Sequence, residues 1–340
     1  MKKFNLNKVL TMVFFVCLCI FLVVVSINKP RVLVLHSYAT DFSWVTDINE
    51  GIERIMEKKP YSIRYHYMDT KRHPDAEFKE KAGMTARKMV EGWKPNVIIA
   101  VDDNASEYVA KHFNNDPEVN IVFTGLNATP EKYDYDKAAN VTGMLERIPY
   151  DALKEVYMQV VTTEDKSILH ISDSSETSLY IHDELVSFPW EPLQLVDSIQ
   201  CQTFDEWKRL LKENEEKADF LLVTHYHTLQ RSQEDNSIVP PQEVMEWTMQ
   251  NIDIPAIGCW GFNVEDGGMM AVGVSPYEQG EVAAEMAIDI LENKKEPSKI
   301  PIASTELFVM YLQESGLEKH NVKLPTMYEA FARATNSYFE

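Results

Sequence analysis

From residue 31 onward, short runs of β-branched and other apolar residues alternate with amphipathic stretches of helical length. This alternation is typical of parallel strands that are covered by helices on both faces. In the first half it predicts strands over 31–36, 62–68, 96–101 and 119–123, and helices over 46–58, 76–92 and 104–113. Gly92-Trp93-Lys94-Pro95 predicts the end of the second helix, because Gly and Pro both favour termination.

After "NVTGML" at 140–145 the same rhythm starts again. It predicts helices over 149–161, 176–187, 203–215 and 240–250, and strands over 167–171, 193–198, 219–224 and 255–258. A further strand and a long helix follow within 267–297. We therefore expect an α/β fold of two doubly wound parallel-sheet lobes joined by a hinge. Lobe 1 is expected over 29–145 and lobe 2 over 146–262, while 263–340 is expected to form the hinge return and complete lobe 1.

The N-terminus carries an almost unbroken apolar run from Val9 to Ile27, preceded by Lys2, Lys3 and Lys8. A charged start followed by an apolar middle is typical of an export signal. The run is long for a signal peptide, whose apolar part has roughly 7–15 residues, and sufficient for a spanning helix of about 20. Residues 1–28 are therefore interpreted as either a signal peptide or a membrane anchor. Both alternatives predict an extracytoplasmic protein, in the periplasm or on the outer face of the cytoplasmic membrane.

The amino-acid composition limits the kinds of partner and cofactor that we expect the protein to bind. The formal net charge is −20, and such a surface repels nucleic acid, so no nucleic-acid partner is expected. Beyond the leader only Cys201 and Cys259 remain, too few for a disulfide framework. We expect two buried free thiols, with a single bridge as the open alternative. No cofactor motif is present, and "THYH" at 224–227 lacks the further ligands that a metal site needs.

Polar and aromatic residues gather where the predicted strands end, and ligands of open parallel sheets bind beyond those ends. The candidate ligand-binding residues are His36, Ser37, Tyr38 and Trp44 after the first strand, Asp102, Asp103 and Asn104 after the third, Thr124 and Asn127 after the fourth, and, in the second half, Ser172, Ser174, Ser175, His225, Tyr226 and Trp260. Helix capping is the alternative role for Asn104 and Ser174. Capping does not explain histidines and aromatic rings at strand ends, so we expect a ligand cleft there.

The chemistry of a closing cleft assigns roles to these candidates, since each buried polar group of a ligand needs a partner. Asp102 or Asp103 is a candidate to hold an ammonium group. The helix starts after Asn104 and Ser175 are candidates for a carboxylate, because free N–H groups and the helix dipole favour anions. Rings suited to a flat or apolar ligand body are those of Tyr38, Trp44, Tyr226 and Trp260. For Trp44 and Trp260, packing in the core or between the lobes is the alternative. Asp69, Lys71 and Arg72 are expected to form a local ion pair or to face the edge of the lobe, with entry of one of them into the cleft as the alternative.

Several stretches together look like one known family. They are "VLVLHSY" at 32–38, "YHYMDTKR" at 65–72, "NVIIAVDDNA" at 96–105, "FTGLN" at 123–127, "NVTGMLE" at 140–146 and "GGMMAVGVSPYEQGEVAAEMAIDIL" at 267–291. The chain thus resembles the ABC-transporter substrate-binding proteins that include tryptophan- and tyrosine-binding members, and also extracytoplasmic sensor modules of bacterial receptors. The resemblance implies a periplasmic-binding protein type I fold, with three crossing strands as hinge. The lipid-attachment cysteine of many Gram-positive relatives is missing, which argues against lipoprotein anchoring.

The sequence thus predicts a solute-binding protein rather than an enzyme. By resemblance, the first guess for the ligand is an aromatic or other amino acid, delivered to an ABC permease. A subunit that presents its bound state to a membrane receptor or kinase is the alternative. A hydrolytic enzyme, using Asp102 with Asp103 or Ser172 with His225, is disfavoured because adjacent residues on one loop seldom converge on one reacting atom and no G-x-S-x-G elbow is present.

Overall fold

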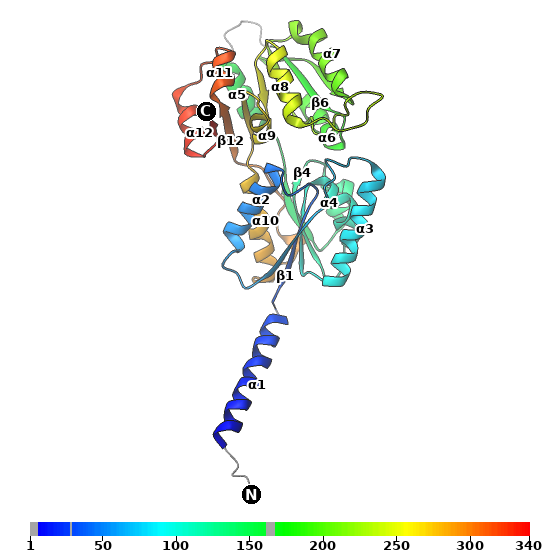
Figure 1. Ribbon diagram of the computed structural model, residues 1–340, viewed down its shortest axis with the longest axis vertical. Helices are drawn as coiled ribbons and strands as arrows, with labels where there is room; N and C mark the ends of the chain where they lie inside the picture. Colours follow the sequence, from blue (N-terminus) through cyan, green and yellow to red (C-terminus); the bar gives the residue numbers. More distant parts are fainter. Residues whose placement is uncertain (1–5, 28, 161–166) are drawn as a thin grey trace.

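The computed structural model describes residues 6–27, 29–160 and 167–340. Two lobes, each built on its own sheet, are stacked along the long axis of the molecule (Figure 1). The first sheet has six parallel strands in the order β11-β5-β4-β3-β1-β2. These strands are β1 (Arg31–His36), β2 (Ser62–Tyr67), β3 (Val97–Val101), β4 (Asn120–Leu126), β5 (Val141–Leu145) and β11 (Ala303–Ser304). The central strands β1 and β3 are almost wholly buried, as expected for strands covered on both faces.

Helices cover both faces of the first sheet (Figure 1). On one face α2 (Ser43–Met56) packs closely along α10 (Pro276–Leu291), and on the other α3 (Ala76–Trp93) packs against α4 (Asp102–Tyr108). Short 3-10 helices complete this lobe, namely η1 (Ala110–Phe113), η2 (Pro130–Tyr133), η3 (Tyr135–Lys137) and η5 (Pro297–Lys299). The helix predicted over 104–113 therefore begins two residues earlier and ends at Tyr108.

The second sheet has seven strands in the order β13-β12-β10-β9-β8-β6-β7. Its neighbours pair in parallel except β10 and β12, which are antiparallel. The strands are β6 (Ser167–Asp173), β7 (Gln194–Cys201), β8 (Phe220–Val223), β9 (Ala256–Gly258), β10 (Met270–Val274), β12 (Phe308–Gln313) and β13 (Tyr338–Phe339). The helices of this lobe are α5 (Tyr150–Val160), α6 (Glu176–Ser187), α7 (Phe204–Asn214), η4 (Glu215–Lys217), α8 (Pro241–Asn251), α9 (Gly261–Glu265), α11 (Glu314–Lys319) and α12 (Thr326–Ala334).

Three chain segments cross between the lobes. They join β5 to α5, β10 to α10 and β11 to β12. The structure therefore corrects the expectation that residues 263–340 form the hinge return and complete lobe 1. Among the described elements of 263–340, α10, η5 and β11 return to the first lobe, whereas β10 and β12 pair with each other inside the second sheet. The predicted fold class, two α/β lobes joined by a hinge, is confirmed.

The N-terminal helix α1 (Leu6–Ile27) projects from the end of the first lobe that faces away from the second (Figure 1). None of the helices in the described ranges is both long enough and apolar enough to cross a membrane. The leader or anchor role of residues 1–28 stays a prediction, and residues 1–5 and 28 lie outside the described ranges. Cys201 and Cys259 are buried free thiols, as expected.

Candidate functional site

A cavity of about 500 Å³ lies between the lobes, at the carboxyl ends of their strands. The first lobe contributes Tyr38, Phe42 and Lys71 to its wall, and the second contributes His227 and Phe262. The volume is within the range of small-molecule sites, roughly 300–1,000 Å³. Tyr38, Phe42, Lys71 and Phe262 also border a deeper space of about 10 Å³, in which side chains of Trp44, Asp102, Glu146 and Trp260 meet.

Asp102 lies at the floor of this inner space, directly after β3. Its backbone is left-handed, with φ 68°, a conformation that Asp tolerates better than most residues. The indole Nε1 of Trp44 donates to Oδ1 at 3.0 Å, while Oδ2 is buried and has no hydrogen-bond partner among the described residues. Burial and the nearby carboxylate of Glu146 raise the pKa of Asp102 well above its usual range. A ligand ammonium would give Oδ2 its missing partner.

Glu146 is the first residue of the crossing that follows β5. Trp260 of the second lobe donates to its Oε1 at 2.7 Å, and Asn127 donates to Oε2 at 3.2 Å. Burial raises the pKa of Glu146 to about 8. The carboxyl group of Glu146 thus joins the two lobes at the bottom of the cleft, and its pKa lies near neutral pH.

Aromatic rings from both lobes form the walls above these acids. Phe42 lies 5.4 Å from Phe262 and 5.2 Å from the ring of His227, measured between centroids. Trp260 stacks on Phe262 with nearly parallel planes, 5.6 Å apart, and His225 lies 4.4 Å from Trp260. Flat apolar walls of this kind suit a ligand with a compact apolar body.

Asp173, at the end of β6, is held by a ring of donors. Its carboxylate accepts hydrogen bonds from the backbone N–H and hydroxyl of Ser175 at 3.1 and 2.6 Å, from the hydroxyl of Ser178 at 2.6 Å and from the N–H of Thr228 at 3.1 Å. Burial alone would raise the pKa of Asp173, but these hydrogen bonds and the charge of Lys71 lower it. Asp173 is therefore a fixed negative charge beside the cleft, and its oxygens are already engaged.

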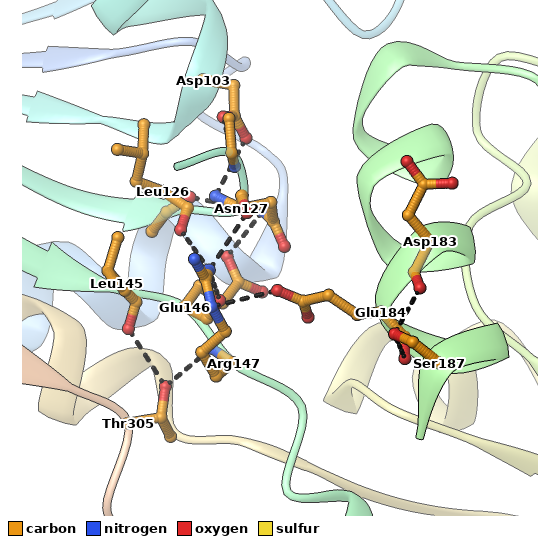
Figure 2. Close-up of polar contacts among 12 residues, drawn as sticks. Asp103, Leu126, Asn127, Leu145, Glu146, Arg147, Asp183, Glu184, Ser187 and Thr305 are labelled. Carbon is orange, nitrogen blue, oxygen red and sulfur yellow. Dashed lines mark hydrogen bonds and ion pairs between the residues drawn. The ribbon is translucent and has the colours of Figure 1, made fainter. Parts of the chain in front are cut away.

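The hinge beneath the cleft is tied together by Arg147 (Figure 2). Its Nη1 donates to the carbonyl oxygens of Leu126 at 3.0 Å, Asn127 at 3.0 Å and Glu146 at 2.6 Å. Its Nε forms an ion pair of 3.0 Å with Glu184 on α6, so one guanidinium contacts both lobes (Figure 2). Thr305, in the third crossing, accepts from the N–H of Arg147 at 3.1 Å. The crossing segments therefore position one another as well as Glu146.

Some of the residues predicted for the site line the cleft. Besides Tyr38, Trp44, Asp102, Asn127, His225 and Trp260, they include Asn104 and Ser175. Ser174 and Ser175 border a second opening of about 620 Å³ on another side of the cleft. Ser175 also caps α6, accepting from the N–H of Ser178, and the side chain of Asn104 donates to Thr70 at 2.9 Å. The ligand contacts of all these residues remain predictions.

The side chain of Asp103 has a different role from that of Asp102. Its Oδ1 accepts from the hydroxyl of Tyr133 at 2.8 Å and the N–H of Ala128 at 3.0 Å, and its Oδ2 accepts from the N–H of Asn127 at 3.2 Å. Burial raises its pKa. With both oxygens engaged, this carboxyl group fixes the loop after β4.

Five other candidates have their polar groups inside their own lobes, and a ligand contact of these residues stays a prediction. His36 contacts Asn49, Ser37 donates to the Val101 carbonyl, Thr124 donates to Gln279, Tyr226 donates to Asp266, and Ser172 is fully buried in β6. Four of these groups instead hold the strand ends and the loops after them in place through hydrogen bonds within each lobe.

The sequence analysis did not select Lys71, Phe42, Glu146 or Phe262 as site residues. Glu146 directly follows β5, so the strand-end rule finds it once that strand is included. Lys71 follows β2 by four residues, and its neighbours Asp69 and Arg72 do form the expected ion pair, at 2.8 Å. Lys71 itself turns into the cleft.

Comparisons with known proteins agree with this geometry. The ABC transporter substrate binding protein family matches residues 44–335. Similar solved structures include a conserved domain protein from Vibrio cholerae, 17% identical with a TM-score of 0.70 and covering 92% of this chain and 100% of that one. An ABC domain in complex with L-Trp from Streptococcus pneumoniae is 15% identical, with a TM-score of 0.66 and coverages of 88% and 98%. The complex of the TorS sensor domain with TorT is 10% identical, with a TM-score of 0.52 and coverages of 87% and 97%. No curated protein matches the chain.

Proposed function

The chain belongs to the ABC transporter substrate-binding protein family, and from that premise we propose that it closes its two lobes over a small molecule with an ammonium group and a compact apolar body, and delivers it to an ABC permease. The first candidate is an aromatic amino acid. A protein of this family is typically extracytoplasmic, which agrees with the export signal expected in residues 1–28.

One observation carries the proposal for the ligand. The buried Oδ2 of Asp102 has no partner among the described residues and borders a space that opens into a cavity walled by aromatic rings. Leaving a buried acceptor unpaired costs roughly 1–3 kcal/mol, so a ligand that donates to it gains at least part of that energy. The raised pKa of Asp102 returns toward its usual range when a cation is bound beside it.

A thermal-shift screen of the full chain tests this proposal. The panel contains amino acids, aromatic amines, sugars and purines. With all compounds at one concentration, an amine-bearing aromatic compound is expected to stabilise the protein most; a concentration of 100 times its dissociation constant corresponds to about 2.7 kcal/mol. Stabilisation by sugars alone would contradict the proposed ligand class, and stabilisation by no compound that fits the cavity would contradict the binding function.

Sensing is a second candidate output, favoured by the similarity of the fold to the TorS sensor domain–TorT complex. In that case the closed, ligand-bound protein would be presented to a membrane receptor instead of a permease. Deletion of the gene separates the two outputs. Loss of uptake of the identified ligand supports delivery, whereas normal uptake with loss of a ligand-dependent response supports sensing.

A further inference from the structure

The side-chain ammonium of Lys71 lies in a cage of three aromatic rings. Its Nζ is 4.7 Å from the ring centroid of Tyr38, 5.2 Å from that of Phe42 and 5.8 Å from that of Phe262. The first two rings belong to lobe 1 and the third to lobe 2, so the cage is complete only when the lobes are together. Within the part of the chain that the structure describes, Nζ forms no hydrogen bond or ion pair. Ring faces attract a cation without needing its N–H groups, which is how aromatic cages hold quaternary ammonium ions.

The acidic residues around the cage favour a cation at this position. Asp173, Asp102 and Glu146 all act on the Lys71 ammonium, whose pKa is nevertheless lowered by burial. Of these three groups Asp173 is the one whose pKa is lowered, whereas burial raises the pKa of Asp102 and of Glu146, so those two carboxyl groups ionise more readily when a cation lies beside them. Further out, the large cavity is bordered by Glu265 and Asp266, and by Asp41 and Asp69, which form ion pairs with Arg72 in the same wall. Coulombic attraction in a partly desolvated cleft is stronger than in water, so Asp173, and Asp102 and Glu146 once ionised, favour a cation in the cleft.

Lys71 also stands between the two spaces of the cleft. It borders the outer cavity of about 500 Å³ and the inner space of about 10 Å³ that contains Asp102 and Glu146. The outer cavity is large enough for a small molecule, whereas the inner space is too small for one. A ligand ammonium that moves from the outer cavity toward Asp102 therefore has to take the place of Nζ.

We propose that Lys71 is a tethered stand-in for the ligand's cationic group: its ammonium fills the cation subsite of the empty protein, and organic cations with a compact apolar body displace it. This inference rests on the proposed ligand-binding function of the cleft. A carboxylate on the ligand is not required for binding at this subsite. The flexible four-carbon stem of lysine lets the displaced ammonium move to the acidic mouth of the cavity.

The opposite role for Lys71 makes opposite predictions. If its ammonium were the partner of a ligand carboxylate, removing it would weaken the binding of acids and zwitterions. If it is a competitor, removing it strengthens the binding of amines. An amine without a carboxylate and an acid without an amine, built on the same apolar body, therefore separate the two roles.

The test uses full-length wild type, Lys71→Ala and Lys71→Met. Lys79→Ala is the matched control, because Lys79 also borders the cleft near Asp173 but, within the described residues, forms no cation–π contact with the three cage rings. Thermal unfolding is followed in tetramethylammonium chloride and in sodium chloride at equal ionic strength. We expect tetramethylammonium to stabilise Lys71→Ala, whose cage is empty, and to leave wild type and Lys79→Ala unchanged.

Calorimetric titration with tryptamine and with 3-indolepropionate completes the test. Tryptamine is expected to bind Lys71→Ala and Lys71→Met about tenfold more tightly than wild type. In the wild type Lys71 fills the subsite in most molecules, and the apparent affinity falls in proportion to the fraction of molecules whose subsite is vacant. The proposal is overturned if neither cation gains from the substitutions, or if 3-indolepropionate binds wild type and loses affinity in the variants. If the role of Lys71 is overturned but the screened ligands still stabilise wild type, the proposed binding function stands. The binding function itself is contradicted if no ligand stabilises wild type.

Discussion

Asp102 shows how one residue can be specialised by its surroundings. It is placed in the left-handed region, its Oδ1 is held by Trp44, and the opposite oxygen is left free in the cleft. Gly125 makes this arrangement possible, since a Cβ at that position would lie 2.9 Å from Oδ1 of Asp102 and the backbone there has φ +65°. This unpartnered oxygen is the reason for proposing that Asp102, rather than Asp103, contacts the ligand.

Replacing Asp102 by Asn tests that role. Asn tolerates the left-handed backbone and keeps an acceptor for Trp44, so the fold is expected to persist. Loss of the carboxylate is expected to weaken binding of an ammonium ligand by roughly 1–3 kcal/mol, measured by calorimetry. Asp103→Asn is the neighbouring control, and its main effect is expected on the free energy of unfolding because its carboxyl group holds the loop after β4. Equal loss of affinity in both variants would contradict the assignment.

The raised pKa of Glu146 predicts that the stability of the ligand-free protein depends on pH. Its pKa is raised from 4.5 to about 8, so the folded state keeps a proton that the unfolded state has lost. The resulting stabilisation is complete below pH 4.5 and disappears as the pH rises through about 8. Unfolding of wild type and Glu146→Gln is compared between about pH 5 and pH 9, and the wild-type stability is expected to fall more steeply with rising pH. Parallel curves for the two proteins would show that Glu146 is not the group responsible.

For single residues, the sequence predicts which positions lie near the strand ends better than it predicts what each side chain contacts. The strand-end rule selected Asp102 and Trp260 together with Ser37 and Tyr226, whose hydroxyls turn out to be engaged within their lobes. It could not separate Asp102 from Asp103, because the left-handed backbone that turns one carboxyl group into the cleft depends on contacts with distant residues. Lys71 was not selected as a site residue for the same reason, since its environment comes from rings of both lobes.

Among the elements, the pair α2 and α10 determines how the first lobe is joined to the hinge. The two helices cross at glycines. A Cβ on Gly51 would lie 2.4 Å from the carbonyl oxygen of Tyr277, and one on Gly280 would lie 2.2 Å from that of Ile48. Beside this contact, the Gln279 side chain accepts from the hydroxyl of Thr124 at 2.8 Å and the N–H of Gly125 at 2.9 Å. The close crossing thus places Gln279 of α10 against the end of β4, where Gly125 packs against Asp102.

Gly280→Ala is expected to force the helices apart and to destabilise the protein by about 1–3 kcal/mol, as overpacked cores do. Gly92→Ala is its control, because Gly92 is exposed near the end of α3 and a Cβ there meets no atom within 4 Å. That substitution is expected to be neutral or stabilising by up to about 1 kcal/mol, owing to the higher helix propensity of Ala. Urea denaturation measures both. A neutral Gly280→Ala would show that the crossing can relax without cost.

Periodicity predicted the elements themselves well, including β1 at 31–36 and α6 at 176–187, because buried strands and amphipathic helices differ clearly in pattern. It did not predict where β12 belongs. A short strand near the C-terminus has the same apolar pattern whichever sheet it joins, and its pairing with β10 is decided by the course of the crossing segments.

For the whole molecule, the two lobes meet through groups that also form the site. Trp260 reaches Glu146, Phe42 contacts Phe262, and Arg147 pairs with Glu184, so closure of the lobes and completion of the site are one event. Lys132, on η2, contacts both Glu176 and Tyr180 of α6 and adds a further link at the rim. Binding energy gained inside the cleft is therefore expected to stabilise the closed arrangement of the lobes.

A crystal structure of the protein with the compound that stabilises it most tests the central claim directly. The account predicts closed lobes with the ligand between them and its nitrogen within about 2.7–3.2 Å of the Asp102 carboxylate. Its apolar body should lie among the rings of Tyr38, Phe42 and Phe262, with the ammonium of Lys71 moved out of the cage. A ligand bound outside the cleft, or one that leaves Asp102 without a contact, would contradict it.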